Sequence, residues 1–109
     1  MEAAPFSQEA EEAVLGSVLI NPEVFFDVAP FLPPEDFYLH HNRWIWEALL
    51  RLLDQRQPID ILTVSEELGR QGKLSEVGGE AYLTGLVARV PTSLHAEAYG
   101  KLGEQAAHP

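Results

Sequence analysis

The sequence predicts an all-α fold, a small orthogonal bundle of about five to six helices. Three observations support this class. Apolar residues recur at intervals of three and four, Asn, Asp, Pro and Gly separate the apolar segments, and no alternating β pattern lasts more than a few residues. The chain has 109 residues, of which 46% are hydrophobic and 22% charged, so we expect one ordinary folded domain.

The first predicted helix runs from about Gln8 to about Ile20. Ser7 precedes it as a candidate cap, and acidic residues in its first turn suit the positive end of the helix dipole. Gly16 weakens the helix slightly but permits close packing. The apolar stripe contains Ala10, Ala13, Val14, Leu15 and Val18.

A short second helix is predicted over 22–29, because Asn21 can cap it and proline suits its first position. Three prolines then exclude a continuous helix over 30–34, although residues 34–37 can form one further turn. We expect three aromatic side chains to anchor this connection on the core, namely Phe31, Phe37 and Tyr38.

The segment from about Asn42 to Gln57 is the most apolar and predicts the central, mostly buried helix. Two tryptophans, Trp44 and Trp46, belong to it, and core packing is favoured over base stacking because basic neighbours are missing. Glu47 and Arg51 are four residues apart, which predicts a surface ion pair.

A further helix is predicted from Ile61 to about Gln71, with Asp60 as its cap and Gly72 at its end. Its inward residues are Ile61, Val64 and Leu68. A Gly-Gly turn at 78–79 leads to a helix over about 80–88, which Pro91 closes. The helical face shared there consists of Tyr82, Leu83, Leu86 and Val87.

These elements predict an N-terminal tail over 1–6, a globular helical head over 7–91 and a terminal helix over 92–109. The terminal helix starts near Leu94 after a Thr-Ser cap and contains Gly100 and Gly103, which each cost about 1 kcal/mol relative to alanine in a helix. We expect it to fray unless something packs on it.

The charge is strongly negative, with 17 Asp and Glu against 7 Lys and Arg and a formal charge of −10. Tight binding to nucleic acid is therefore not expected, since it depends on Lys and Arg that displace counterions from phosphates. Eight acids lie in the first 42 residues: Glu2, Glu9, Glu11, Glu12, Glu23, Asp27, Glu35 and Asp36. They form either an ordinary solvated surface or a docking face for a basic partner.

Catalytic, cofactor-binding and metal-binding motifs are not found, so the chain is not expected to be an enzyme. Neither Gly-Lys pair has the first glycine or the final hydroxyl of a P-loop. The adjacent His40 and His41 have no third ligand at suitable spacing, and there is no cysteine. Four carboxylates are interpreted as helix caps or solvated residues: Asp36, Asp60, Glu66 and Glu67.

A cytoplasmic location without membrane association is expected. No stretch approaches the roughly 18 apolar residues that cross a bilayer, and the first five residues lack the basic start and apolar run of a signal peptide.

Residues 5–16 resemble the opening of DnaB-type replicative DNA helicases, roughly P-x-S-x-E-A-E-x-x-V-L-G. Further family landmarks follow in the same order along the chain, to about Tyr99. They are Glu35-Asp36-Phe37-Tyr38, Pro58-Ile59-Asp60-Ile61, Gly72-Lys73-Leu74, Val77-Gly78-Gly79, Ala81-Tyr82-Leu83, Val90-Pro91-Thr92-Ser93 and Ala98-Tyr99.

The resemblance implies the N-terminal collar domain of a hexameric helicase, truncated before the linker and the RecA-like motor that would use ATP and Mg²⁺. Family members of this kind assemble with other helicase subunits and receive the C-terminal domain of primase. By motif position, Glu9 and Tyr82 correspond to places of primase contact. Their alternative roles are a residue near the helix dipole and a core residue.

Two alternatives remain open at this point. One is the helicase-binding domain of a primase, or a stand-alone replication adaptor, both of related helical architecture. The other is a helical domain that binds nucleic acid, which the acidic composition argues against.

Overall fold

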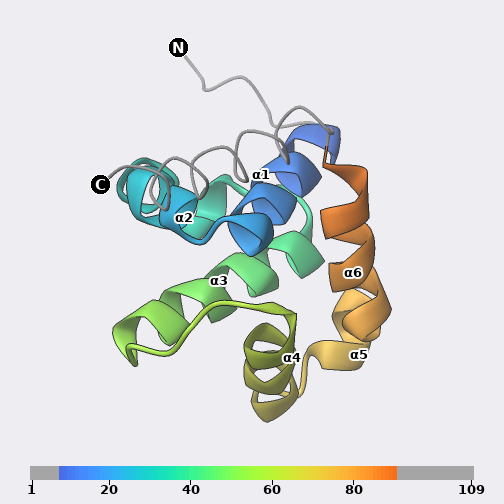
Figure 1. Ribbon diagram of the computed structural model, residues 1–109. Helices are drawn as coiled ribbons and strands as arrows, with labels where there is room; N and C mark the ends of the chain where they lie inside the picture. The colour runs from blue at the N-terminus through green and yellow to red at the C-terminus, as the bar shows by residue number, and fades with distance from the viewer. Residues whose placement is uncertain (1–7, 91–109) are drawn as a thin grey trace, which may run out of the picture.

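The computed structural model describes residues 8–90, and within this range every regular element is a helix (Figure 1). Six α-helices occur: α1 (Gln8–Ile20), α2 (Glu23–Val28), α3 (His40–Asp54), α4 (Ile61–Arg70), α5 (Leu74–Val77) and α6 (Gly79–Arg89). Two 3₁₀ turns, η1 (Ala29–Phe31) and η2 (Pro34–Asp36), join α2 to α3. The all-α prediction is confirmed. The cap at Ser7, Pro91, the tail over 1–6 and the terminal helix over 92–109 lie outside the described residues.

Helix α3 is the centre of the bundle, and it packs against α1, α4 and α5. Its Trp46 is fully buried between two phenylalanines, with ring centroids 4.8 Å from Phe25 and 5.2 Å from Phe37. The indole N–H donates to the Leu32 carbonyl over 2.8 Å, which satisfies its one polar atom. Trp46 thus ties the α2–α3 connection to the core, as expected of a core tryptophan.

The α2–α3 connection differs from the prediction in two of its three aromatic anchors. Phe37 is buried, but Phe31 is 82% exposed and Tyr38 is 77% exposed, so the anchor role predicted for those two was wrong. The two 3₁₀ turns rotate Leu32 inward in place of Phe31. Trp44 is only partly buried on the side of α3, where the Lys73 ammonium lies 4.3 Å from its ring centroid.

The ends of α4 follow the predicted local chemistry. The Asp60 carboxylate accepts from the Thr63 backbone N–H over 2.8 Å, and the Thr63 hydroxyl accepts from the Asp60 N–H over 3.0 Å. This reciprocal pair is a capping box. At the other end, Gly72 has φ of 71°, the left-handed conformation that lets a helix terminate.

An ion pair between a partly exposed arginine and a buried glutamate joins α3 to α4 and overturns two predictions. Arg51 Nε donates to Glu67 over 2.7 Å, so Arg51 does not form the expected pair with Glu47. Glu67 is only 1% exposed and also accepts from Arg70 over 2.7 Å, so its assignment to the solvated face was wrong. The reason is that Arg51 of α3 lies opposite Glu67 of α4, within reach of a direct hydrogen bond.

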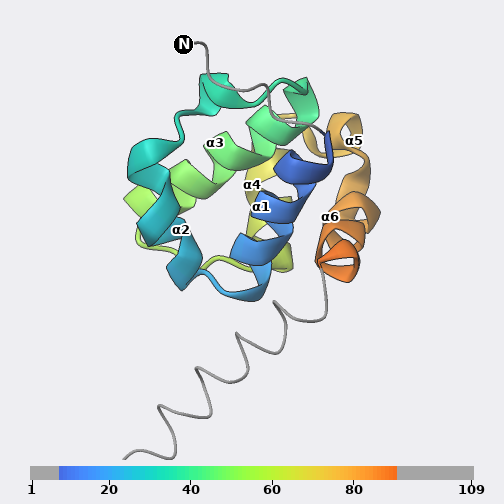
Figure 2. The same ribbon diagram turned by 90° about the horizontal axis from the view of Figure 1, so that it is seen from above.

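Helices α1 and α6 lie side by side (Figure 2). A β-carbon on Gly16 would overlap the Val90 side chain and would lie 2.5 Å from the Leu86 carbonyl oxygen. No residue other than glycine fits such a close approach without displacing backbone. The predicted role of Gly16 in close packing is confirmed.

Candidate partner-binding surface

The two sequence-predicted contact residues occupy neighbouring helices. Glu9 is exposed in the first turn of α1, and Tyr82 is partly buried in the first turn of α6. These two helices, α1 and α6, pack directly against each other along one helix–helix seam.

An ion pair crosses this seam. Arg89 Nη1 of α6 donates to the Glu12 carboxylate of α1 over 2.9 Å, and Gln8 Nε2 donates to the other Glu12 oxygen over 2.9 Å. Arg89 also places its guanidinium carbon 5.9 Å from the centroid of the Tyr82 ring. Glu12 lies one helical turn after Glu9, so the pair connects the part of α1 that bears Glu9 to the Tyr82 ring.

The Tyr82 hydroxyl is already engaged inside the chain. It donates to Asn42 Oδ1 over 2.7 Å, and the His41 ring meets the tyrosine ring edge-on at 5.2 Å. Burial, followed by the nearby negative charge of Glu12, raises the pKa of Tyr82 to about 12 against the opposing effect of Arg89. The phenol is therefore neutral at pH 7.

The Glu11 carboxylate is bonded to Asn42, the residue that holds the Tyr82 hydroxyl. Glu11 is 1% exposed, and it accepts from the Tyr38 backbone N–H over 2.6 Å and from Asn42 Nδ2 over 2.9 Å. The backbone N–H of Leu39, the residue before α3, also points to it at 3.4 Å. The residue before α3, Leu39, has no side chain that can cap the helix. The Glu11 carboxylate of α1 instead accepts from backbone N–H groups at the N-terminus of α3.

The polar network thus continues from Glu11 through Asn42 to the Tyr82 hydroxyl, across α1, α3 and α6. Sequence reasoning missed Asn42 and Arg89 altogether and treated Glu11 as a surface acid. Of the eight acids in the first 42 residues, Glu11 and Glu12 are buried and cannot belong to an acidic docking face. The available signal was spacing, because Glu11 and Glu12 lie four residues before Leu15 and Gly16 and so share a helix face with them.

Within 8–90, no three His, Cys, Asp or Glu side chains are grouped as metal ligands. In the same range no helix is long and apolar enough to cross a membrane. Glu11, Asn42 and the Tyr82 hydroxyl bond to one another or to the backbone, and Glu12 accepts from the side chains of Arg89 and Gln8. Within residues 8–90 the chain is thus an all-helical bundle whose α1 and α6 are joined by an ion pair and a buried polar network.

Comparison with known proteins identifies the family. A sequence model described as "DnaB-like helicase N terminal domain" matches residues 3–102. The chain is 41% identical over 101 residues to the replicative DNA helicase DnaB of Geobacillus stearothermophilus and 40% identical over 101 residues to the replicative DNA helicase DnaC of Bacillus subtilis. Each alignment covers 93% of this chain.

A solved structure agrees with the sequence comparison. The crystal structure of the N-terminal domain of DnaB helicase from Mycobacterium tuberculosis superposes with a TM-score of 0.77 at 35% identity, covering 88% of this chain and 71% of that chain. The chain belongs to the DnaB-like helicase N-terminal domain family. The helicase origin is therefore favoured over the primase domain that the sequence left open.

The match concerns one part of a larger kind of protein. The chain spans 22% of the length of the Geobacillus and Bacillus helicases, and its similarity lies in their N-terminal domain. These 109 residues do not include the motor domain of such helicases, so no helicase or ATPase activity is assigned to them.

Proposed function

We propose that this domain serves as the collar of a replicative helicase, where it contributes to hexamer assembly and binds the C-terminal domain of primase during DNA replication. ATP and Mg²⁺ would be used by a motor domain elsewhere in such a helicase. The cytoplasm is the compartment in which this function would be carried out.

The proposal that the domain binds primase rests on one observation: side chains along the α1–α6 seam are held in fixed positions before any partner binds. Arg89 holds Glu12 and lies over the Tyr82 ring, while Asn42 holds the Tyr82 hydroxyl. A partly exposed aromatic ring that is fixed in position loses little conformational entropy on binding, and such rings are frequent energetic centres of interfaces. The exposed carboxylate of Glu9, on the adjoining helix, would add electrostatic selection for a basic partner.

The test is a titration of the domain with primase C-terminal domain, followed by calorimetry. We expect Glu9→Ala and Tyr82→Ala each to weaken binding by about tenfold, which corresponds to about 1.4 kcal/mol. Two matched controls are Glu23→Ala, which removes an exposed carboxylate from α2, and Tyr38→Ala, which removes a tyrosine that is 77% exposed.

Circular dichroism establishes that each variant is folded. Tyr82→Phe separates the ring from the hydroxyl, since it keeps the contact surface and loses only the bond to Asn42. Equal affinities for wild type, folded Glu9→Ala and folded Tyr82→Ala would remove both residues from the binding surface.

The assembly part of the proposal is tested by static light scattering across a wide range of protein concentration. We expect this chain to self-associate weakly, with an average mass that increases with concentration. A hexamer that persists at the lowest measurable concentration would contradict this expectation, because the interface would then be complete within these 109 residues.

A further inference from the structure

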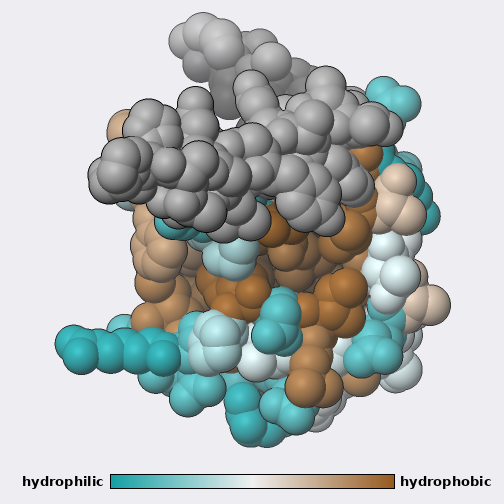
Figure 3. Space-filling view, in the orientation of Figure 1, coloured by the Kyte–Doolittle hydropathy of each residue, from teal (hydrophilic) through white to brown (hydrophobic). Residues whose placement is uncertain are grey.

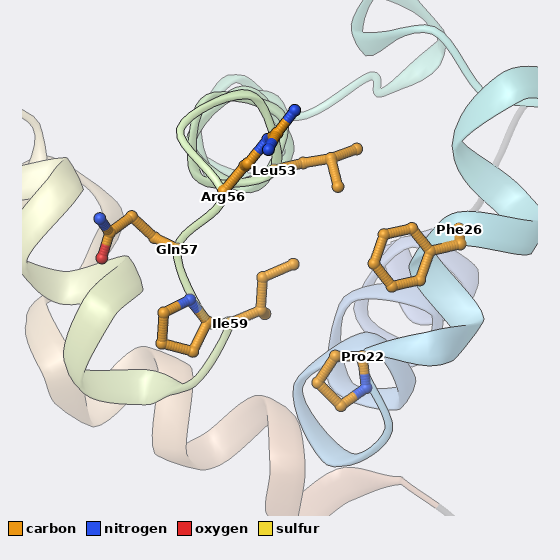
Figure 4. Close-up of a pocket in the computed structure, with 7 residues that line it drawn as sticks. Pro22, Phe26, Leu53, Arg56, Gln57 and Ile59 are labelled. Atoms are coloured by element: carbon orange, nitrogen blue, oxygen red, sulfur yellow. The ribbon is translucent and has the colours of Figure 1, made fainter.

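An apolar pocket lies apart from the α1–α6 seam, between the start of α2 and the α3–α4 connection. Its volume is about 550 Å³, and its apolar lining consists of Pro22, Phe26, Leu53, Pro58 and Ile59. Phe26 faces Leu53 and Ile59 across the opening, as Figure 4 shows. In the view of Figure 3, hydrophobic side chains gather in a hollow bordered by hydrophilic ones. Phe26 is 54% exposed, so apolar surface here remains open to solvent.

Arg56 lies at the edge of the same pocket, and it differs from the other basic residues of the described range. Arg51 and Arg70 bind Glu67, Arg89 binds Glu12, Arg43 donates to the Phe37 carbonyl, and Lys73 lies over Trp44. Lys101 falls outside residues 8–90. Arg56 is therefore the one basic side chain within 8–90 with no partner in the chain, on a protein whose net charge is −10.

The backbone at Arg56 favours glycine, yet the chain has arginine there. The Gln57 N–H donates to the Leu52 carbonyl and the Arg56 N–H to the Leu53 carbonyl, which is the hydrogen-bond pattern of a Schellman motif. The same motif closes α4, where the equivalent position is Gly72. Arg56 has φ of 59° and is the one non-glycine residue with positive φ in the described range. Strained residues of this kind concentrate at functional sites.

We propose that this pocket binds a short peptide segment of a partner protein, in which an apolar side chain is followed closely by a carboxylate. The apolar side chain would fill the space between Phe26, Leu53 and Ile59, and the carboxylate would pair with Arg56. Elsewhere the acidic surface repels such a segment, so charge complementarity directs it to this edge.

A peptide suits this pocket better than a small metabolite. Sites for small molecules usually combine an apolar lining with several placed polar groups that fix orientation. Among residues 8–90, Arg56 and Gln57 are the only polar side chains that line the pocket, and Gln57 is directed away from Phe26 (Figure 4). A short peptide can supply the two groups that this pocket would bind, namely one apolar side chain and one carboxylate that pairs with Arg56.

The test selects binders from a random peptide display library with the whole chain as bait. The expected result is enrichment of sequences that carry Leu, Ile or Phe within a few residues of Asp or Glu. A selected peptide is then synthesised and titrated against variants. We expect Arg56→Gly to weaken its binding about tenfold, and Phe26→Asp to abolish it.

Two controls keep the outcome decisive. Arg56→Gly suits the left-handed backbone, so its urea midpoint should be at least that of wild type and lost binding cannot be ascribed to unfolding. Phe31→Asp alters a phenylalanine that is 82% exposed and does not line the pocket, and it should leave peptide affinity unchanged. Tyr82→Ala should do the same, which separates this site from the proposed primase surface.

The proposal is overturned if the library yields no enriched sequence or yields sequences without acidic residues. It is overturned equally if a selected peptide binds Arg56→Gly as tightly as wild type. Loss of peptide binding in Tyr82→Ala with retention in Phe26→Asp would place the peptide on the α1–α6 seam instead.

Discussion

Buried glutamates connect helices in this domain. Glu67 of α4 accepts hydrogen bonds from Arg51 of α3 and from Arg70 and Gln71 at the end of its own helix. The bond from Arg70, together with Arg51 and Gln71, lowers the pKa of Glu67 below its usual 4.5, although burial acts in the opposite direction. The carboxylate is therefore charged at neutral pH and holds α3 and α4 together.

Glu67→Gln should destabilise the fold by about 2 kcal/mol at pH 7, because charge-assisted bonds become neutral ones. Since the pKa is lowered in the folded state, this contribution is present above pH 4.5 and is lost as the pH falls through the folded-state pKa. The stability difference between wild type and Glu67→Gln, measured by urea unfolding, should thus shrink under acid conditions.

The exposed neighbour Glu66 provides the control for this experiment. Glu66→Gln should change the free energy of unfolding by less than about 0.5 kcal/mol at any pH, as is usual for surface residues. A difference between wild type and Glu67→Gln that stays constant from neutral to acid pH would contradict the assigned ion pair.

At the scale of elements, the close approach of α1 and α6 determines the geometry of the proposed partner surface. Gly16 lies against the Leu86 carbonyl and Val90, and Arg89 then reaches Glu12 across the seam. Asn42 binds both Glu11 of α1 and the Tyr82 hydroxyl of α6, so a wider separation of α1 and α6 would disturb these bonds as well. The packing of these two helices and the position of the tyrosine ring are therefore linked.

Gly16→Ala should reduce the free energy of unfolding by about 2 kcal/mol, because the added methyl group must displace backbone or Val90. Gly69→Ala is the matched control. A β-carbon at Gly69 in α4 meets nothing within 4 Å, so the same substitution should stabilise the protein by about 1 kcal/mol through helix propensity. Thermal unfolding followed by circular dichroism measures both, and equal effects of the two substitutions would argue against the close α1–α6 contact.

At the scale of the whole molecule, the charge of −10 governs which partners can approach. Five of the six Lys and Arg side chains within 8–90 are engaged with groups of the chain itself, which leaves Arg56. The described surface therefore offers no cluster of free cations for a phosphate backbone.

We expect no submicromolar binding of DNA even at low salt, measured by fluorescence anisotropy with labelled single-stranded and double-stranded oligonucleotides. The titration is repeated at several salt concentrations, because binding to phosphates depends on ionic strength. Affinity that appears at low salt and falls steeply as salt is added would show that the domain contacts phosphates after all.

Features set by neighbours in the chain were predictable from the sequence. The Asp60 capping box, the left-handed Gly72 and the bounds of α1 depend on residues within a few positions of one another. The resemblance to DnaB-type helicases also came from the order of local motifs, and the comparisons confirmed it. Glu9 and Tyr82 remain predicted contact residues, now placed on adjoining helices.

Features set by distant residues required the tertiary structure. A side chain on an amphipathic helix can pair within its own helix or with another helix, and periodicity does not distinguish the two. Arg51 therefore pairs with Glu67 rather than Glu47, Glu11 is buried beneath Tyr38, and Leu32 rather than Phe31 enters the core.

The sequence by itself determined an acidic, all-helical domain of a replicative helicase, because composition, helix periodicity and local motifs are properties of short segments. Only the tertiary structure decided which acids are internal, how Tyr82 is held and where an unpaired Arg56 meets an apolar pocket. These depend on which helix faces meet, and that choice is made by packing the whole core at once.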